Sequence, residues 1–505
     1  MEQVAGKRIA VIGGGIGGLT AAALLARQGH SVTLYEQASV LGGCASTFQR
    51  RGFIFDVGAT QVAGLEPGGI HHRIFQFLDL ELPEATPCDP SCAVFLPRET
   101  MPINVWRDPI RWQQERQAQF PGSEPFWQFL QQLFQANWAF QARDPIIPPR
   151  NLWDAWQAVQ ALRPGTLVTA PHIFSTVNDA LRVYGLDSDR RLKTFLDLQL
   201  KLYSQVDATE TALLYAATAL GVSQAPQGLS HLHGSMQSLS DRLVSAFQRD
   251  GGVLRMRHRV TRIQVKEGKR RYGTATGVTV TNLKTGDAQF DPADHVVANV
   301  TVQDLVNLLG KDAPAGYARR VEKLPPGSGA FVVYLGVEAE ALPSDCPPHL
   351  QFLYDYDGPI GENNSLFVSV SRPGDGRAPV DKATIIASSF TDLQPWNRPE
   401  GYATLKAAYT QSAIARLGQY FTLNDRTLIH QESATPKTFA HFTGRDLGRV
   451  GGIGQRIQTF GPFGLATRTP LAGLWLVGDS VHPGEGTAGV SYSALAIAQQ
   501  IQAQS

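Results

Sequence analysis

The stretch Arg8-Ile9-Ala10-Val11-Ile12-Gly13-Gly14-Gly15-Ile16-Gly17-Gly18 decides the fold of this chain. Its apolar, β-branched beginning predicts a short buried strand that stops at the first glycine. Residues 19–28 then predict a helix closed by Gly29, and residues 31–36 predict a second strand. We therefore expect a strand–turn–helix–strand unit, which is typical of an α/β protein with a parallel sheet.

The glycine spacing in this unit is that of a dinucleotide-binding turn. Gly13, Gly15 and Gly18 stand in the G-x-G-x-x-G register, and the acidic Glu36 ends the second strand. The first glycine permits the tight turn, the second lets a pyrophosphate approach the backbone, and the third lets the helix pack closely on the sheet. The helix N-terminus would face the phosphates, and Glu36 would accept hydrogen bonds from the adenosine ribose. The alternative, a glycine loop that only turns the chain, has no use for the acid.

Composition excludes several classes of protein. The chain has 505 residues, of which 43% are hydrophobic and 18% charged, and this suits two or three globular domains. A net charge of +1 predicts no nucleic-acid partner. The 4 cysteines form no CxxC pair, so we expect no metal site and a reducing compartment. The uncharged run 9–26 is interrupted by glycines, which argues against a signal peptide or transmembrane helix.

The rest of the chain divides into interleaved pieces. We expect the dinucleotide domain to consist of residues 1–73, 230–304 and 440–505. Residues 74–229 are rich in Gln, Phe, Trp and Leu at helical spacing and predict a mainly helical region. Residues 305–439, with predicted strands and helices, complete a mixed sheet-and-helix substrate domain. The further elements that we expect are strands at 253–265, 277–283, 295–299, 330–337 and 366–371, and helices at 236–249, 402–417 and 490–500.

A second motif near the C-terminus indicates a flavin rather than NAD. Residues 474–479 predict a strand ending in Gly478-Asp479, followed by Gly486-Thr487-Ala488-Gly489 and a helix. Such a strand end can place the Asp479 carboxylate on a ribityl hydroxyl, while the helix N-terminus faces the flavin or a phosphate. An ordinary turn or helix cap is the alternative role for Asp479. Both motifs together favour a Rossmann-type FAD-binding domain.

These motifs resemble a known family in their order along nearly the whole chain. They are Val11 to Leu19 with Glu36, Leu41-Gly42-Gly43, Phe55 to Gly58, and Val477 to Gly484. Together they look like the carotenoid desaturase and isomerase family, a branch of the FAD-containing amine-oxidase-like superfamily. Residues 42–48 and 482–492 are most similar to the cyanobacterial C-3',4' desaturases of the myxoxanthophyll pathway. Bacterial phytoene desaturases typically have Arg where this chain has Cys44, which counts against a phytoene substrate.

The resemblance implies a chemistry and a setting. Flavin N5 would accept hydride from a saturated carbon of a carotenoid end while a proton leaves its neighbour, and quinone or oxygen would take up the electrons. The substrate dissolves in bilayers, so we expect a peripheral, monotopic membrane contact on the cytoplasmic side. The cofactor-binding residues that the motifs and the resemblance imply are Gly13, Gly15, Ile16, Gly17, Gly18, Glu36, Gly42, Gly43, Val260, Gly478, Asp479, Gly489 and Val490.

Other functions stay open at this point. A prolycopene cis-trans isomerase would share every cofactor motif and use reduced FAD without net oxidation. An amine or protoporphyrinogen oxidase should show converging charged residues in the middle of the chain, and no obvious set stands there. A prenyl-binding protein like the Rab GDP dissociation inhibitors need not hold a flavin at all.

Candidate side chains for the substrate site are few. His482, three residues past Asp479, should lie near the flavin, where an acid–base role or a turn-shaping role is open. His231 and His233 flank a predicted strand-to-helix loop and could equally be candidate site residues or solvated, and His71 and His72 look like capping or surface residues. No histidine has metal-ligand spacing.

Two segments predict a substrate path. Residues 211–222 are apolar with small side chains, which suits either the wall of a narrow channel or a plain buried helix. Residues 146–156 combine prolines, tryptophans and Arg150, and this composition suits either a membrane contact or a core segment.

Overall fold

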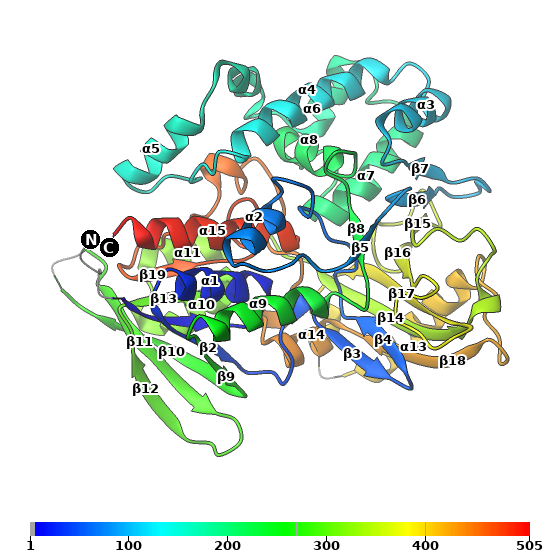
Figure 1. Ribbon diagram of the computed structural model, residues 1–505. Helices are drawn as coiled ribbons and strands as arrows, with labels where there is room; N and C mark the ends of the chain where they lie inside the picture. The colour runs from blue at the N-terminus through cyan, green and yellow to red at the C-terminus, as the bar shows by residue number, and fades with distance from the viewer. Residues whose placement is uncertain (1–5, 269–270, 399, 505) are drawn as a thin grey trace.

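The fold is built around a parallel sheet. The computed structural model describes residues 6–268, 271–398 and 400–504 (Figure 1). Its five-stranded parallel sheet has the order β19-β13-β1-β2-β9. The strands are β1 (Arg8–Ile12), β2 (Ser31–Glu36), β9 (Val253–Met256), β13 (His295–Ala298) and β19 (Leu474–Leu476). The predicted strand–turn–helix–strand unit and the α/β class are confirmed, and three distant parts of the chain contribute strands.

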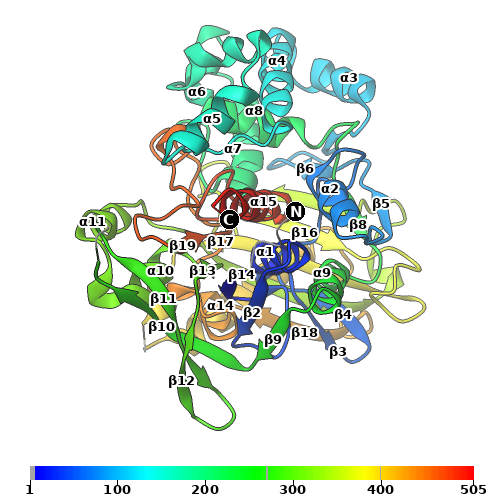
Figure 2. The same ribbon diagram turned by 60° about the vertical axis from the view of Figure 1, so that its left-hand side comes forward.

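Three helices cover one face of this sheet. They are α1 (Ile16–Arg27), α9 (Gln237–Arg249) and α15 (Thr487–Gln502), and α1 packs against the other two (Figures 1 and 2). Every residue of α1 from Ile16 to Ala26 is buried. Burial on all sides explains why this segment carries no charge, because a charged side chain there would lose its hydration. The last helix begins at Thr487, three residues before its predicted start.

The predicted strand 253–265 is two strands in two sheets. The chain turns at Arg257, which has a φ of 60°, so only β9 joins the parallel sheet. β10 (His258–Lys266) instead pairs with β11 (Thr274–Asn282), which pairs with β12 (Ala288–Pro292) in an antiparallel sheet. Apolar residues of β10 and β11 pack with α10 (Val302–Leu309) on the second face of the parallel sheet.

A larger mixed sheet stands beside the parallel one. Its seven strands have the order β18-β14-β17-β16-β15-β6-β7, and only the β15–β6 pair is parallel. The strands are β18 (Leu428–Ala434), β14 (Gly329–Glu338), β17 (Lys382–Thr391), β16 (Ser365–Val370), β15 (His349–Leu353), β6 (Cys92–Phe95) and β7 (Ile103–Val105). One face packs against α13 (Tyr402–Leu417), and the other contributes to the cavity described below.

A layer of helices lies above both sheets (Figure 1). It contains α3 (Pro109–Gln119), α4 (Glu124–Gln141), α5 (Leu152–Ala161), α6 (Val177–Val183), α7 (Arg190–Ser204) and α8 (Leu213–Gly221). Its core is aromatic, with Trp112, Trp127 and Phe195 in ring contact. Residues 74–229 are thus largely helical, but β6 and β7 of this range belong to the mixed sheet.

Short elements connect the layers. They are β3 (Thr47–Arg50), β4 (Phe53–Asp56), α2 (Ile70–Phe77), β5 (Ala85–Pro87), β8 (Ser230–Leu232), α11 (Ala315–Glu322), α12 (Gln394–Asn397) and α14 (Pro436–Thr443). Within the described residues, no helix combines the length and hydropathy needed to cross a bilayer.

Candidate active site

One cavity of about 1660 Å³ runs through the middle of the molecule. It begins at the carboxyl ends of β1, β2 and β13, beside the loop that follows β19, and continues between the mixed sheet and the helices α4 and α8. Ligand pockets for a single small molecule have volumes of roughly 300–1000 Å³, so this cavity has room for a cofactor and a substrate together.

The glycine turn after β1 forms the floor of the cavity. Gly13 has a φ of 93°, which favours glycine. A Cβ at Gly18 would stand 2.0 Å from the Gly13 carbonyl oxygen, so a larger residue cannot follow the turn at this position. Gly15 and Gly17 line the cavity, whereas Gly18 lies behind it against the turn.

Asn299 holds this turn from behind. It directly follows β13, and its Nδ2 donates a hydrogen bond to the Gly13 carbonyl oxygen over 3.3 Å. A Cβ at Gly15, Gly17 or Gly478 would come within 3.0 Å of the Asn299 side chain. The sequence analysis missed Asn299, although its place at the end of the third predicted strand matches that of Glu36 at the end of the second.

Glu36 ends β2 beside the glycine turn. Its Oε2 accepts a hydrogen bond from the Gly14 N–H, and its Oε1 accepts one from the Ala38 N–H, both over 2.7 Å. Burial raises the pKa of this carboxyl, and the backbone donors oppose the rise. Each carboxylate oxygen keeps a second lone pair for a further donor, which a ribose hydroxyl provides.

Two helix N-termini face the same cavity. α1 has Gly15 as its N-cap and α15 has Gly486, and neither cap residue makes a side-chain hydrogen bond. Gly17 in the first turn of α1 and Thr487 to Val490 in the first turn of α15 line the cavity. Free N–H groups and positive dipole ends therefore meet the cavity at two points, and both favour phosphate or carbonyl oxygens.

Asp479 lies at the cavity wall together with a charged partner. Its carboxylate forms an ion pair with Arg445, which follows α14 and was missed by the sequence analysis. Nearby carboxylates, Asp479 above all, raise the pKa of Arg445 against the opposing effect of burial. The guanidinium Nε of Arg445 is buried without a partner, which leaves a donor for a further group. No single sequence motif joins Arg445 to Asp479, so only the fold reveals the pair.

His482 lines the cavity as expected and is 8% exposed. Its Nε2 lies 3.0 Å from the amide nitrogen of Gln141 on α4, and its Nδ1 has no partner. Burial lowers its pKa to about 4, so the ring is neutral at neutral pH. It can accept a proton only weakly, and this favours a shaping role over acid–base chemistry.

Two other histidines are buried rather than solvated. His71 lies in α2 and is 1% exposed, with Nδ1 bonded to the Ala63 carbonyl and Nε2 3.2 Å from the Ser491 hydroxyl. His231 lies in β8 and is equally buried. The surface prediction for His71 was wrong and the solvated alternative for His231 does not hold, because partners of these rings come from distant parts of the chain. His72 and His233 are half-buried.

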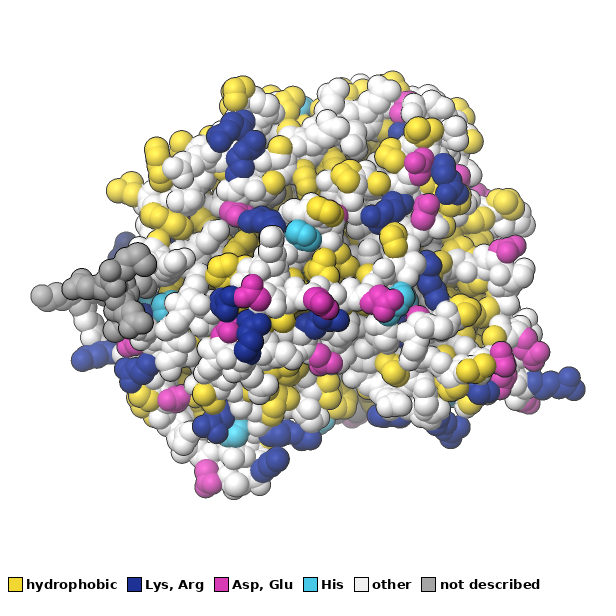
Figure 3. Space-filling model, viewed as in Figure 1, with side chains coloured by type: hydrophobic (Ala, Val, Ile, Leu, Met, Phe, Trp, Pro, Cys, Tyr) yellow, Lys and Arg dark blue, Asp and Glu magenta, His cyan; other side chains and the backbone are white. Residues whose placement is uncertain are grey.

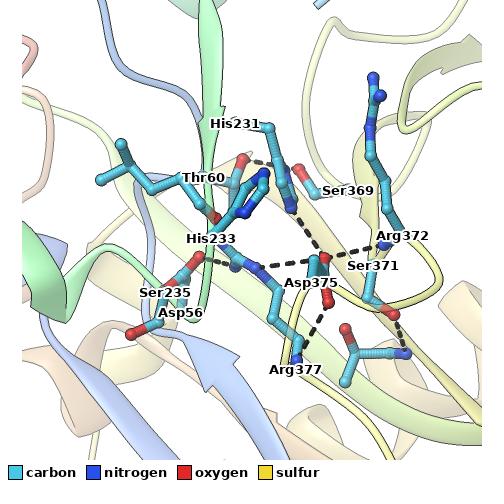
Figure 4. Close-up of polar contacts among 12 residues, drawn as sticks. Asp56, Thr60, His231, His233, Ser235, Ser369, Ser371, Arg372, Asp375 and Arg377 are labelled. Atoms are coloured by element: carbon cyan, nitrogen blue, oxygen red, sulfur yellow. Dashed lines mark hydrogen bonds and ion pairs between the residues drawn. The ribbon is translucent and has the colours of Figure 1, made fainter. Parts of the chain in front are cut away.

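Figure 4 shows the buried polar network that surrounds His231. His231 Nε2 bonds to Asp375 Oδ2 over 2.9 Å, and the Asp375 carboxylate also accepts the backbone N–H groups of Arg372 and Arg377. Arg377, 2% exposed, pairs with Asp56, which is fully buried at the end of β4. The network joins β4, β8 and the loop after β16.

A hydrogen bond between two hydroxyl groups lies beside this network at the cavity wall. The hydroxyl of Thr60, which lines the cavity, lies 2.6 Å from that of Ser369 in β16 (Figure 4). This bond joins the Thr60 segment to the mixed sheet at the cavity wall. No cluster of three or more metal-ligating side chains occurs in the part of the chain that the structure describes.

Helix α8 answers the question left open for residues 211–222. Leu213, Ala216 and Ala217 pack into the core of the helical layer. Leu214, Tyr215, Thr218, Ala219 and Val222 line the cavity. One face of the helix is thus core and the other is cavity wall.

The structure gathers the sequence-predicted site residues at one place. The residues that line the cavity are Gly13, Gly15, Ile16, Gly17, Glu36, Gly42, Gly43, Val260, Gly478, Asp479, His482, Gly489 and Val490. Gly18 does not line the cavity and instead lies behind the turn, next to the Gly13 carbonyl group. Three cavity residues that the sequence analysis did not consider, Lys201, Gln205 and Glu485, form a polar group in the wall.

Comparison with known proteins agrees with this site. Residues 16–444 match the model of the family described as "Flavin containing amine oxidoreductase". The chain is 28% identical to prolycopene isomerase 1 of an Oncidium hybrid cultivar, over 98% of this chain and 83% of that protein. It is 24% identical to the zeta-carotene-forming phytoene desaturase of Myxococcus xanthus, over 98% of this chain and 94% of that protein.

Solved structures share the fold. An oxidoreductase from Methanosarcina mazei aligns with a TM-score of 0.63 at 18% identity, over 97% of this chain and 100% of that one. Cyclohexylamine oxidase from Brevibacterium oxydans aligns with a TM-score of 0.60 at 18% identity, over 98% of this chain and 100% of that one. At this identity the likeness concerns the fold alone.

Proposed function

Because this chain belongs to the flavin containing amine oxidoreductase family, we propose that it is an FAD-dependent carotenoid desaturase. The proposed reaction is C-3',4' desaturation of an acyclic or monocyclic carotenoid end, as in myxoxanthophyll-type biosynthesis. The observation that carries the proposal is that one continuous cavity joins the glycine turn to a largely apolar chamber under α4 and α8. Carotenoid-acting relatives over nearly the full chain support the substrate class.

The residues at the parallel sheet fit FAD. The Gly13–Gly18 turn and the N-terminus of α1 suit the pyrophosphate, Glu36 suits the adenosine ribose, and Asp479 suits the ribityl chain. The unpartnered Nε of Arg445 and the uncapped N-terminus of α15 leave donors for flavin oxygens. Bound FAD supplies the two-electron chemistry of the reaction, with quinone or oxygen as the final acceptor.

The protein's own part is to hold the hydrocarbon and keep water out. Side chains from α4 and α8, among them Trp138, Leu214 and Thr218, form one wall, and Phe367 of β16 and Phe390 of β17 stand on the mixed-sheet side. An apolar chamber of this kind favours a long hydrocarbon, because burying its surface removes it from water.

A second candidate is prolycopene cis-trans isomerisation with reduced FAD. The relatives named as prolycopene isomerases favour it, since they match 98% of this chain. The two candidates use the same cavity and cofactor site, and they differ in whether the substrate loses hydrogen.

Pigment chromatography separates the two. A carotenoid-producing host receives prolycopene or a 1'-hydroxylated acyclic carotene, each with and without this protein. A product two hydrogens lighter and absorbing at longer wavelength supports desaturation. An all-trans product of unchanged mass from prolycopene contradicts it and supports isomerisation.

A cavity-filling variant provides the matched control. Ala219→Phe places a ring in the chamber from α8. We expect it to abolish turnover while flavin content stays unchanged. Ala288→Phe, on the exposed strand β12, should leave both unchanged.

We further propose a peripheral membrane contact through the surface of α5 and the following 3₁₀ helix Pro164–His172. Apolar side chains on this surface are strongly exposed: Leu152 (90%), Trp156 (58%), Val159 (55%), Leu167 (64%) and Phe174 (71%). Hydrophobic side chains gather over this part of the molecule in Figure 3, at the upper left. Leu162, Thr166 and Thr169 of the same segment line the cavity, so the chamber reaches this surface.

The segment 146–156 is only partly this surface. Ile146 is 2% exposed, and Asp154 is fully buried in an ion pair with Arg468. Leu152 and Trp156 point outward, and the exposed apolar side chains continue past residue 156. The contact that we propose thus lies further along the chain than the sequence indicated.

Vesicle flotation tests the contact. We expect the double variant Trp156→Ser/Leu167→Ser to float poorly with lipid vesicles, because it removes buried apolar area from the contact. Val380→Ser, at an 87% exposed position away from α5, is the control. Equal flotation of both variants would contradict the proposed surface.

A further inference from the structure

Three polar side chains meet at one point of the chamber wall, where α7 ends and the loop before α15 passes. Gln205 Nε2 donates a hydrogen bond to Glu485 Oε2 over 2.9 Å. Lys201 Nζ donates one to the Gln205 backbone carbonyl over 2.8 Å. All three residues line the cavity. Neither Glu485 nor Gln205 has a part in the proposed binding of FAD.

The Glu485 carboxyl is only half satisfied. Its Oε1 is buried and has no hydrogen-bond partner, and the same is true of the Gln205 Oε1. A buried carboxyl oxygen without a donor costs free energy, so such groups call for a functional or solvent partner. The unpartnered oxygen is available to a group that enters the chamber.

The backbone around Glu485 is shaped to hold it there. Gly484 and Gly486 on either side have φ values of 118° and 84°, which favour glycine. Gln205 itself has a φ of 67°, a strained value for a residue with a side chain. A Cβ at Gly451 would stand 2.1 Å from Gln205 Nε2 and 2.6 Å from Glu485 Oε2. The absence of a side chain at Gly451 therefore leaves the space for this contact.

Burial shifts the pKa of both ionisable groups in the direction that favours their uncharged forms. Burial raises the pKa of Glu485 well above its ordinary value, and the Asp479 charge adds to the rise, while Lys201 and Arg445 oppose it. Burial lowers the pKa of Lys201, and Arg456 lowers it further. A carboxyl with a pKa nearer the working pH exchanges protons more readily than an ordinary one.

A second pocket lies on the other side of the same residues. It has a volume of about 270 Å³, and Lys201 and Gln205 line it as well as the large cavity. Its other walls include Asp207, Glu210 and Arg456, and the Glu210 side chain is 48% exposed. Lys201 and Gln205 therefore stand between the apolar chamber and a polar pocket that reaches solvent.

We propose that Glu485 accepts the proton released in desaturation and that Lys201 passes it to this polar pocket. The inference rests on the proposed function. Two C–H bonds break and one C=C bond forms. Bound FAD would supply the two-electron oxidation by taking one hydrogen with its electron pair, and the other hydrogen would leave as a proton to the ionised Glu485 carboxylate. The Lys201 ammonium then gives one of its protons to water in the polar pocket and takes up the proton of Glu485 in its place.

Glu485→Gln is the central test, because it keeps the shape and removes the proton acceptor. Flavin-loaded protein in lipid vesicles receives a 1'-hydroxylated acyclic carotene without oxygen, and bleaching of the flavin is followed in a single turnover. We expect a rate roughly 10²–10⁴-fold below the unsubstituted protein, with unchanged flavin content. Glu66→Gln changes a half-buried carboxyl that lines neither pocket and should bleach at the original rate.

The pH dependence sharpens the test. The polar and charged groups around Glu485 are Gln205, Lys201, Asp479, Arg445 and Tyr215. Only the ionised carboxylate accepts a proton, so the rate should rise with pH through the Glu485 pKa. Glu485→Gln should remove this rising limb, and Lys201→Met should slow repeated turnovers more than the first.

An infrared titration provides a readout apart from activity. Protein labelled with ¹³C-glutamate should show protonated carboxyl absorption that persists above the ordinary glutamate pKa. Because burial also raises the pKa of Glu36, the Glu485 band is the part of this absorption that Glu485→Gln removes. Failure of the unsubstituted protein to bleach refutes the proposed function, and the infrared band then decides on Glu485 alone. Bleaching by Glu485→Gln within about threefold of the original rate, or a band that titrates normally, refutes the inference.

Discussion

Replacing Arg377 by Met should destabilise the protein more than any surface change. In the native structure the Arg377 guanidinium pairs with Asp56 and donates to the Leu232 carbonyl over 3.0 Å (Figure 4). Asp56 is 0% exposed, and after the change it keeps only the Met236 N–H and the Thr47 hydroxyl as donors.

The magnitude follows from these contacts. Removing one partner of a buried ion pair costs about 3–5 kcal/mol, because the other charge stays buried without compensation. The carbonyl of Leu232 loses its charged donor, which adds about 1 kcal/mol. We therefore expect a total loss of about 4–6 kcal/mol in the free energy of unfolding.

A double variant separates charge from packing. Asp56→Asn together with Arg377→Met removes the uncompensated carboxylate and keeps side chains of similar size. We expect it to regain at least half of the stability that the single change loses. A double variant as unstable as the sum of its parts would assign the loss to packing instead.

Urea unfolding of the flavin-loaded chain measures the effect, with flavin fluorescence and circular dichroism as separate probes of its domains. Arg190→Met is the matched control, because its ion pair with Asp357 is exposed, with 63% and 83% of the two side chains accessible. We expect the control to lose less than about 1 kcal/mol. An Arg377→Met protein no less stable than the control would refute this reasoning.

Three further outcomes are expected. Asp479→Ala should raise the dissociation constant of FAD at least about tenfold, since it removes the ribityl acceptor, and undiminished flavin content after gel filtration would contradict this role. Asn299→Ala should loosen the glycine turn by removing the bond to Gly13, and we expect a smaller loss of flavin affinity in the same measurement. His71 has a folded pKa of about 4, below its unfolded value, so the folded state binds fewer protons and stability falls as pH drops from about 6.5 to about 4, by at most about 3 kcal/mol. His71→Gln should flatten that part of the unfolding profile, and an unchanged slope would assign the acid sensitivity to other groups.

Sequence signals that lie close together predicted much of the fold. The β1–α1–β2 unit and α13 begin or end within a few residues of their expected bounds. Glycine spacing, apolar alternation and an acid at a strand end act over tens of residues, so they are readable without a structure. Local motifs of this kind also predicted that Asp479 and the glycines of the turn would line the cofactor site, and these residues line the cavity.

Longer-range features were not predictable in this way. The sequence of residues 253–265 predicts one continuous strand, but a turn at Arg257 sends its halves into different sheets. The setting of His231 stayed open because its partner Asp375 stands 144 residues away. A contact between residues so far apart in the chain produces no local pattern of residues from which it could be predicted.

The sequence by itself determined the dinucleotide turn, the second flavin motif and the family resemblance, since each depends on residues whose neighbours along the chain are also neighbours in space. Only the tertiary structure decided the Asp479–Arg445 pair, the buried network of Asp56 and Arg377, and the contact of Gln205 with Glu485, which are 280 positions apart. The physical reason is that burial and hydrogen bonding depend on what the folded chain packs together, and a side chain's partners across such distances exist only after the sheets and helices have assembled.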